Sequence, residues 1–365
     1  MMRAMPEATV LPEIPTGISN LGMPSPLVTG LDDNDDDPLL HIKDAGIGSY
    51  VLELVSIWGD LMSHLQQIRY GSHQNAWHPD SAYQKIRVQI FETECILPQK
   101  HRFDFVKFGE RSSTEIAKFR QYWDHWILSQ MLYHGIQATL NHPFLHFFRK
   151  NDQQSVRPPS FQQHVIDHSI LHSRWIVRLV ELCQEKQFQL SDPFVGYLVS
   201  VTATVNFFLG FSKDKQLAAK AIENFDKCED FVGQLAQKWK HLNHTRTKLS
   251  KLAQIVPRSP ESRHGTRRPR VNEGLIWSLL DYAASSSPED KTREAYDIVE
   301  VDVNTQYLSP LEQQSLRTTQ TTSPEILPPG NTNDWMHDNF SLEMLEIPDM
   351  PGLLIPDEYW TSGQL

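Results

Sequence analysis

The most regular pattern in the chain is an apolar repeat from residue 218 to residue 242, in which steps of three and four residues alternate. A period of 3.5 residues, held over about three and a half heptads, predicts a long helix with one continuous apolar seam. Such a seam either dimerises as a coiled coil or packs on the core of its own domain. We favour packing within the domain, because the seam mixes small, sulfur-containing and aromatic side chains. The seam consists of Ala218, Ala221, Phe225, Cys228, Val232, Leu235, Trp239 and Leu242.

Helical periodicity extends over most of the chain between residues 45 and 255. Apolar residues three and four positions apart, Val55 and Trp58 among them, predict one face of a helix over 46–70. No convincing pair of strands accompanies this pattern. The sequence therefore predicts an all-α domain over 41–256, either a helical bundle or an α-α superhelix. Further helices are expected over 80–97, 113–140, 158–186 and 191–210, in addition to the seam helix.

The segments outside this domain have a different composition. Residues 1–40 hold six prolines and five carboxylates within the six positions 32–37, which predicts a disordered acidic leader. Residues 257–317 are predicted to be a linker that is first basic and then rich in Ser, Thr and Pro. Its basic part, 257–270, has five arginines against one glutamate and is either a nuclear import signal or a solvated linker. The import candidates are Arg263, Arg267, Arg268 and Arg270.

The last segment, 318–365, alternates acidic and bulky apolar residues. It contains eight carboxylates and no Lys or Arg. Mutual repulsion keeps such a segment open, so its apolar side chains stay available to dock as a short amphipathic helix in a partner's groove. This composition is typical of a transcriptional activation segment. The predicted anchors are Trp335, Phe340, Leu342, Leu345 and Trp360.

Motifs of catalysis are absent from the sequence, which has no nucleotide-binding glycine loop, nucleophile elbow or metalloprotease helix. Three histidines, His164, His168 and His172, form a stripe at i, i+4 and i+8, and His142 and His146 form a further i, i+4 pair. On a helix His164 and His172 lie about 12 Å apart, which is too far for both to bind one metal ion. We therefore expect a solvated helix face, no catalytic or metal-binding residue, no cofactor and no enzyme.

The overall composition restricts the compartment and the partners. Three scattered cysteines and the lack of any membrane-length apolar run predict a protein of the cytoplasm or nucleus, without a membrane. The opening segment has a glutamate and prolines where a secretory signal needs apolar residues. A net charge of −11 argues against direct nucleic-acid binding, because affinity for phosphates needs a concentrated basic surface.

Several segments between about 45 and 245 resemble the C-terminal half of the fungal-specific transcription factor domain, the regulatory region of Zn(II)2Cys6 fungal regulators. Ile57-Trp58-Gly59 is similar to that family's W-G helix, and Leu132-Tyr133-His134 followed by 140–145 resembles its L-x-Y-H … L-H-R-P-F-L run. Asn141-His142 stands where the family usually has His-Arg. Residues 203–211 and 218–239 are similar to the helix pair that closes the family's domain.

The resemblance implies a nuclear regulator of RNA polymerase II transcription that works with the transcription machinery and coactivators. In this family the helical domain is expected to restrain the activation segment or to sense an effector. The family's zinc cluster needs six clustered cysteines and the chain has three scattered ones, so no residue here inherits zinc or DNA contacts. We therefore expect DNA to be reached through a missing domain or a partner. Homodimerisation stays open, and a helical scaffold or corepressor is the alternative, ahead of a helical enzyme.

Overall fold

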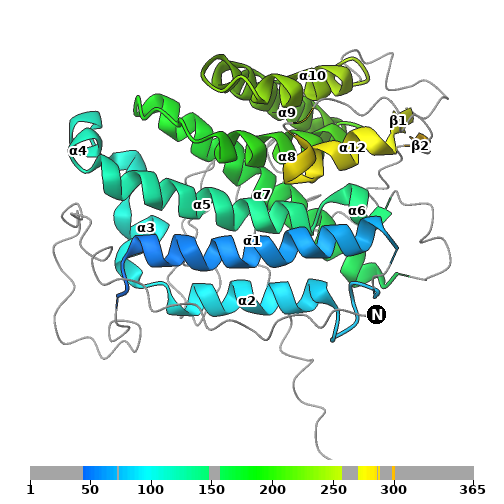
Figure 1. Cartoon of the computed structure of the whole chain (residues 1–365), viewed down its shortest axis with the longest axis horizontal. Coiled ribbons are helices and arrows are strands. Elements are labelled where there is room, and N and C mark those ends of the chain that lie inside the picture. The colour runs from blue at the N-terminus through cyan, green and yellow to red at the C-terminus, as the bar shows by residue number, and fades with distance from the viewer. Residues whose placement is uncertain are drawn as a thin grey trace, which may run out of the picture.

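The computed structural model describes residues 44–71, 74–147, 157–256, 270–285 and 287, together with the backbone of 298–300. The predicted leader, most of the predicted linker and the activation segment lie outside these ranges. Apart from one short strand pair, the described part is helical, and the predicted all-α class is confirmed (Figure 1).

The helices follow one another closely along the chain. They are α1 (Ile47–Arg69), α2 (Ala82–Ile96), η3 (Gln99–His101), α3 (Phe103–Val106), η4 (Phe108–Glu110), α4 (Ser113–Lys118), α5 (Arg120–Leu140), α6 (Pro143–Phe147), α7 (Pro159–Glu185), α8 (Pro193–Leu209), α9 (Lys215–Lys238), α10 (Leu242–Ala253), α12 (Glu273–Leu280) and α13 (Tyr282–Ser285). The strands are β1 (Arg270–Asn272) and β2 (Ile298–Glu300).

Side-chain caps fix where several helices begin. Ser81 accepts a hydrogen bond from the backbone N–H of Gln84 at the start of α2, and Asp192 accepts one from Phe194 at the start of α8. Each cap satisfies an N–H that has no partner inside the helix. Proline at the first position of α8 suits the helix start, because its fixed φ is already helical. These starts agree with those predicted from the sequence.

Two details of the predicted helices are wrong. The helix predicted over 113–140 is broken at Phe119, where the backbone leaves helical values (φ −108°, ψ 32°) and the partly buried ring packs on the core. Val55, predicted to face inward on α1, is 42% exposed. It follows Leu54, which is buried, and one helical step turns a side chain by about 100° away from its neighbour.

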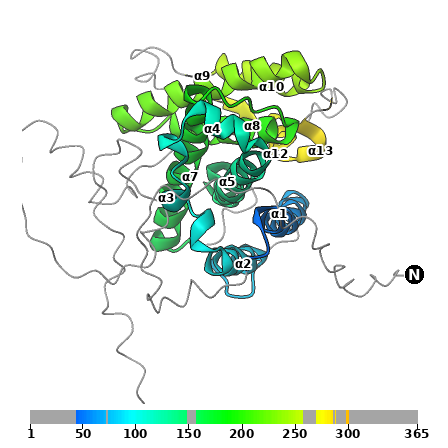
Figure 2. The same ribbon diagram turned by 90° about the vertical axis from the view of Figure 1, so that its left-hand side faces the viewer.

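The helices stack across the molecule, with α1 and α2 along one edge and α9 and α10 along the opposite edge (Figures 1 and 2). Helix α8 lies between them and contacts α5, α7, α9, α10 and α12. Its residues 195–209 are all buried, which explains why the segment is apolar on every side. The close approach of α9 depends on Gly196, where an added Cβ would lie 2.8 Å from the Leu235 side chain.

The predicted seam helix packs within its own domain. Phe225, Cys228 and Val232 are buried, and α9 makes its most extensive contact with α8. The helix ends at Lys238, so that Leu242 belongs to α10. Trp239, the residue at which the helical geometry ends, is 41% exposed. The apolar seam is therefore used inside the chain, as we favoured.

The core continues beyond residue 256, where the sequence placed the start of the linker. Ile276, Leu279 and Leu280 on α12 are fully buried, and the hydroxyl of Tyr197 on α8 donates to the carbonyl of Leu280 at 2.6 Å. Asp281 pairs with Arg69 on α1 at 3.2 Å. The predicted boundary at 256 is therefore too early, because a short amphipathic helix set in a polar stretch gives little sign that it docks.

A short antiparallel ladder precedes α12. Val271 on β1 lies opposite Val299 on β2, and Val271 is buried against the core. No strand was expected from the sequence, since three residues are too few for an alternating pattern to emerge. Arg270, one of the predicted import residues, is exposed on β1.

Candidate functional site: a groove between α7 and α9

Two adjoining pockets open between the C-terminal half of α7 and the middle of α9. Their volumes are about 230 Å³ and about 420 Å³. Val180 and Gln184 of α7 and Phe231 and Gln234 of α9 line both pockets, so the two form one groove. Helices α7 and α9 are separate in the sequence, and α8, which packs on both, brings them together.

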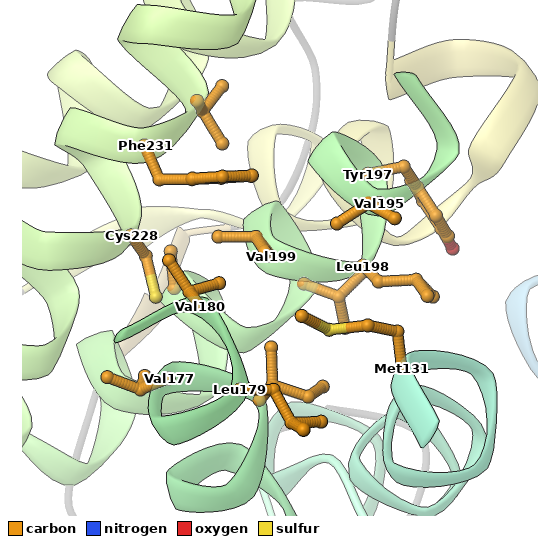
Figure 3. Close-up of a cluster of buried hydrophobic side chains, with 14 of the residues drawn as sticks. Met131, Val177, Leu179, Val180, Val195, Tyr197, Leu198, Val199, Cys228 and Phe231 are labelled. Atoms are coloured by element: carbon orange, nitrogen blue, oxygen red, sulfur yellow. The ribbon is translucent and has the colours of Figure 1, made fainter. Parts of the chain in front are cut away.

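The floor of the groove is apolar. Figure 3 shows Cys228 projecting from α9 toward Val180 of α7 and the Phe231 ring lying beside Val199 of α8, with Val177 further along α7. All five line the smaller pocket and are buried. An apolar side chain placed here would lose contact with water, which contributes about 25 cal/mol for each Å² covered.

The thiols at the groove do not supply a nucleophile. Cys183 lines the larger pocket and Cys228 the smaller, and both are buried. Burial raises the pKa of each thiol above its ordinary value, since a thiolate would lose its hydration. The protonated thiol is a poor nucleophile, so these cysteines act as small apolar groups.

An ion-pair network closes one end of the groove. Lys227 on α9 donates to Glu181 on α7 at 2.7 Å and pairs with Glu223 at 2.6 Å. Partial burial alone would lower the pKa of Lys227, but the hydrogen bonds to the two carboxylates raise it overall. The hydrogen bond from Lys227 likewise lowers the pKa of Glu223. Lys227 and Glu223 therefore stay charged, and the network links α7 to α9.

The opposite end is formed by the turn after α7. Gln187 has a left-handed backbone (φ 57°), and the N–H of Phe188 donates to the carbonyl of Cys183 at 2.7 Å, as in a helix stop. The guanidinium of Arg120 lies 4.2 Å from the centre of the Phe188 ring. The rim between the two ends is rich in neutral amides, namely Gln184, Gln187, Gln189, Gln234 and Gln237.

An apolar floor with an amide rim is suited to binding. The amides offer both donors and acceptors without a fixed charge. Such a groove accepts an apolar side chain or the apolar face of a helix, while the rim bonds to its polar edge. The sequence did not predict this site, because α7 and α9 contribute to it from segments about fifty residues apart. The one sign of the groove in the sequence was Phe231, an apolar residue that lies next to the seam residue Val232.

The prediction that the histidine stripe forms a solvated helix face is wrong. His172 is buried on α7 and its Nδ1 lies 2.9 Å from Nδ1 of His134 on α5. His164 and His168 are half-buried, with ring centres 3.9 Å apart. Burial lowers the pKa of His134 to about 3 and that of His168 to about 4, so the rings are neutral at physiological pH. The stripe packs inward because α7 has apolar residues along the same side.

The pair His142 and His146 is also internal. The N–H of Phe144 donates to Nδ1 of His142 at 3.1 Å, so the ring proton is on Nε2, which donates to the hydroxyl of Thr204 at 2.8 Å. A ring nitrogen of His146 lies 2.8 Å from the carbonyl of Leu140. These bonds tie the turn between α5 and α6 to α8. In the described part of the chain, no group of three or more His, Cys, Asp or Glu side chains is arranged to hold a metal ion.

Most residues predicted to be functional lie outside the described ranges. These are Trp335, Phe340, Leu342, Leu345, Trp360, Arg263, Arg267 and Arg268, while Arg270 is exposed on β1. Among the helices that the structure describes, none is both long and apolar enough to cross a bilayer.

Comparison with protein-family models, with curated proteins and with solved structures finds no match for this chain.

Proposed function

We propose that the chain is a transcription regulator in which a folded helical domain is joined to an acidic activation segment, 318–365. The observation that carries the proposal is the composition of that segment. Eight carboxylates, without a single Lys or Arg, are interleaved with tryptophan, phenylalanine and leucine. The carboxylates accelerate encounter with a basic surface, and the apolar side chains dock in a partner's groove. The resemblance to the fungal-specific regulatory domain supports the same reading.

The helical domain supports the proposal through its groove. An apolar floor rimmed by amides suits an amphipathic partner helix, which is the kind of contact a regulatory domain makes. Under this proposal the protein acts in the nucleus together with coactivators, and the arginines of 257–270 serve import. Promoters are then reached through a partner or a further domain.

The experiment is a reporter assay with residues 318–365 fused to a foreign DNA-binding domain. We expect activation, and we expect Trp335→Ala with Phe340→Ala to abolish it, because the two largest anchors near the centre of the segment are lost. Asn331→Ala with Asn333→Ala is the matched control, since it also changes two residues but removes no ring. Equal reporter output from the ring and the control variants would contradict the proposal.

A helical scaffold or corepressor is the second candidate, and the groove is the observation that favours it. Gln184→Arg with Gln234→Arg would place two bulky cations over the rim that both pockets share. If repression of a reporter by the tethered full chain depends on these positions while the segment 318–365 is silent, the scaffold is the better description.

A further inference from the structure

The charge of the chain is unevenly distributed. The whole chain carries −11, yet residues 231–260 contain six Lys or Arg and no Asp or Glu. Lys238 and Lys240 are exposed at the junction of α9 and α10, and Arg246 is exposed on α10 beside Gly233 of α9. Lys248 differs, since its amine is buried and donates to the carbonyls of Ala284 and Ser285. We call Lys238, Trp239, Lys240 and Arg246 the basic face.

The aromatic residue of the basic face is held in a defined position. Trp239 lies between Lys238 and Lys240 and is 41% exposed, whereas Trp123 and Trp126 are fully buried. Its indole N–H donates to the carbonyl of Ser191 at 2.6 Å. That bond anchors one edge of the ring to the turn before α8 and leaves part of the indole open to solvent. The chain leaves helical geometry at this residue (φ −115°, ψ 93°), so that Lys238 is the last residue of α9 and Lys240 lies beyond the helix.

We infer that the basic face binds single-stranded nucleic acid, with one base stacked on Trp239 and phosphates held by Lys238, Lys240 and Arg246. Single strands expose both the flat faces of their bases and a regular row of phosphates, and proteins recognise them by aromatic stacking beside cations. No acidic residue within 231–260 repels a phosphate backbone, and the exposed carboxylate next to Trp239 comes from Asp192, which follows Ser191.

A single strand fits these observations better than the other polyanions. An acidic peptide would use the cations but has no need of a fixed, exposed indole. Duplex DNA keeps its bases stacked inside the helix and out of reach of the ring. The net charge of −11 argues against binding spread over the whole surface, but three cations and one ring suffice for a local contact. The inference does not depend on the proposed role in transcription.

The test uses the full chain and fluorescent twelve-nucleotide oligo(dT) and oligo(U), with binding followed by anisotropy. Three phosphate contacts predict a slope of about −2 for log K against log salt, so raising NaCl from 50 to 200 mM weakens binding about 20-fold. Trp239→Ala should weaken binding by about 5-fold or more, the lower end for loss of one stacked base. Trp239→Phe keeps a stacking ring and should retain most of the affinity. Lys238→Ala with Lys240→Ala should reduce both the affinity and the salt slope.

The controls separate loss of charge from loss of fold. Lys213→Ala with Lys215→Ala removes two exposed lysines near the other end of α9 and should leave binding unchanged. Each variant is compared with the parent by circular dichroism. The inference fails if neither oligonucleotide binds, or if folded Trp239→Ala binds as tightly as the parent. It also fails if a synthetic 318–365 peptide binds the basic face and the oligonucleotides do not, since the face would then recognise acidic peptide.

Discussion

Acidification should destabilise this domain at a buried histidine. His142 is fully buried, and burial lowers its pKa to about 3. In the unfolded chain its pKa is about 6.5. Between these values the unfolded state binds a proton that the folded state excludes, so the stabilising contribution is complete above about pH 6.5 and declines as the pH falls toward 3. At pH 5.0 the pH lies about 1.5 units below the pKa of the unfolded chain, so this one ring lowers the free energy of unfolding by about 2 kcal/mol.

His134 behaves in the same way, because it is buried and its pKa is also lowered to about 3. Together the two rings predict a loss of about 4 kcal/mol between pH 7.5 and pH 5.0. Stabilities of folded domains are usually about 5–15 kcal/mol, so this loss would be a large share of the total. Other groups titrate in the same range, and a single-residue variant is therefore needed to isolate the contribution.

The variant is His142→Gln. A glutamine amide offers one acceptor and one donor, as the neutral ring does toward Phe144 and Thr204, but it does not titrate. Urea unfolding followed by circular dichroism measures how much the free energy of unfolding falls between pH 7.5 and pH 5.0. For the variant this fall should be about 2 kcal/mol smaller than for the parent. His244→Gln, at an exposed position on α10, should leave the loss unchanged. If His142→Gln lost as much stability as the parent over this range, His142 would not be held neutral by burial.

Two further predictions concern stability at neutral pH, both measured by urea unfolding. Leu279→Ala should lower the free energy of unfolding by about 2–5 kcal/mol, because Leu279 is fully buried on α12. Leu52→Ala, at a half-exposed site, should lower it by less than about 0.5 kcal/mol. Equally small effects of both substitutions would mean that α12 does not belong to the core. Gly59→Ala should raise the free energy of unfolding by about 0.5–1 kcal/mol, because nothing lies within 4 Å of the added Cβ. Gly71→Ala should lower it, because the φ of Gly71 is +82°. The reverse order would contradict the backbone geometry at the end of α1.

The sequence predicted those elements whose signals are local. Ser81 and Asp192 cap helices at the predicted starts, since a cap needs only a side chain and the two or three residues after it. The predicted seam from 218 to 242 was long enough for its period to be unambiguous, although the helix that carries it ends at Lys238. Its burial could be inferred from Ala218 and Cys228, which fit an irregular core better than a dimer interface.

Signals that depend on distant residues were missed. The docking of α12, which carries Leu279, requires the face that α8 and α10 provide, and α8 is far from it in the sequence. His172 was expected to be solvated because histidine is polar, but His134 lies opposite it and the Nδ1 atoms of the two rings are 2.9 Å apart. The groove arises only when Val180 and Phe231 are brought together. Such features follow from tertiary packing, which can override local propensity.

Tethering to DNA tests the proposal that this chain activates transcription through residues 318–365. Three fusions to one foreign DNA-binding domain are compared at equal expression, carrying the full chain, residues 1–317 and residues 318–365. We expect activation by the isolated segment 318–365 and none by residues 1–317. Silence of the segment 318–365, or activation by 1–317 as strong as by the full chain, would contradict it.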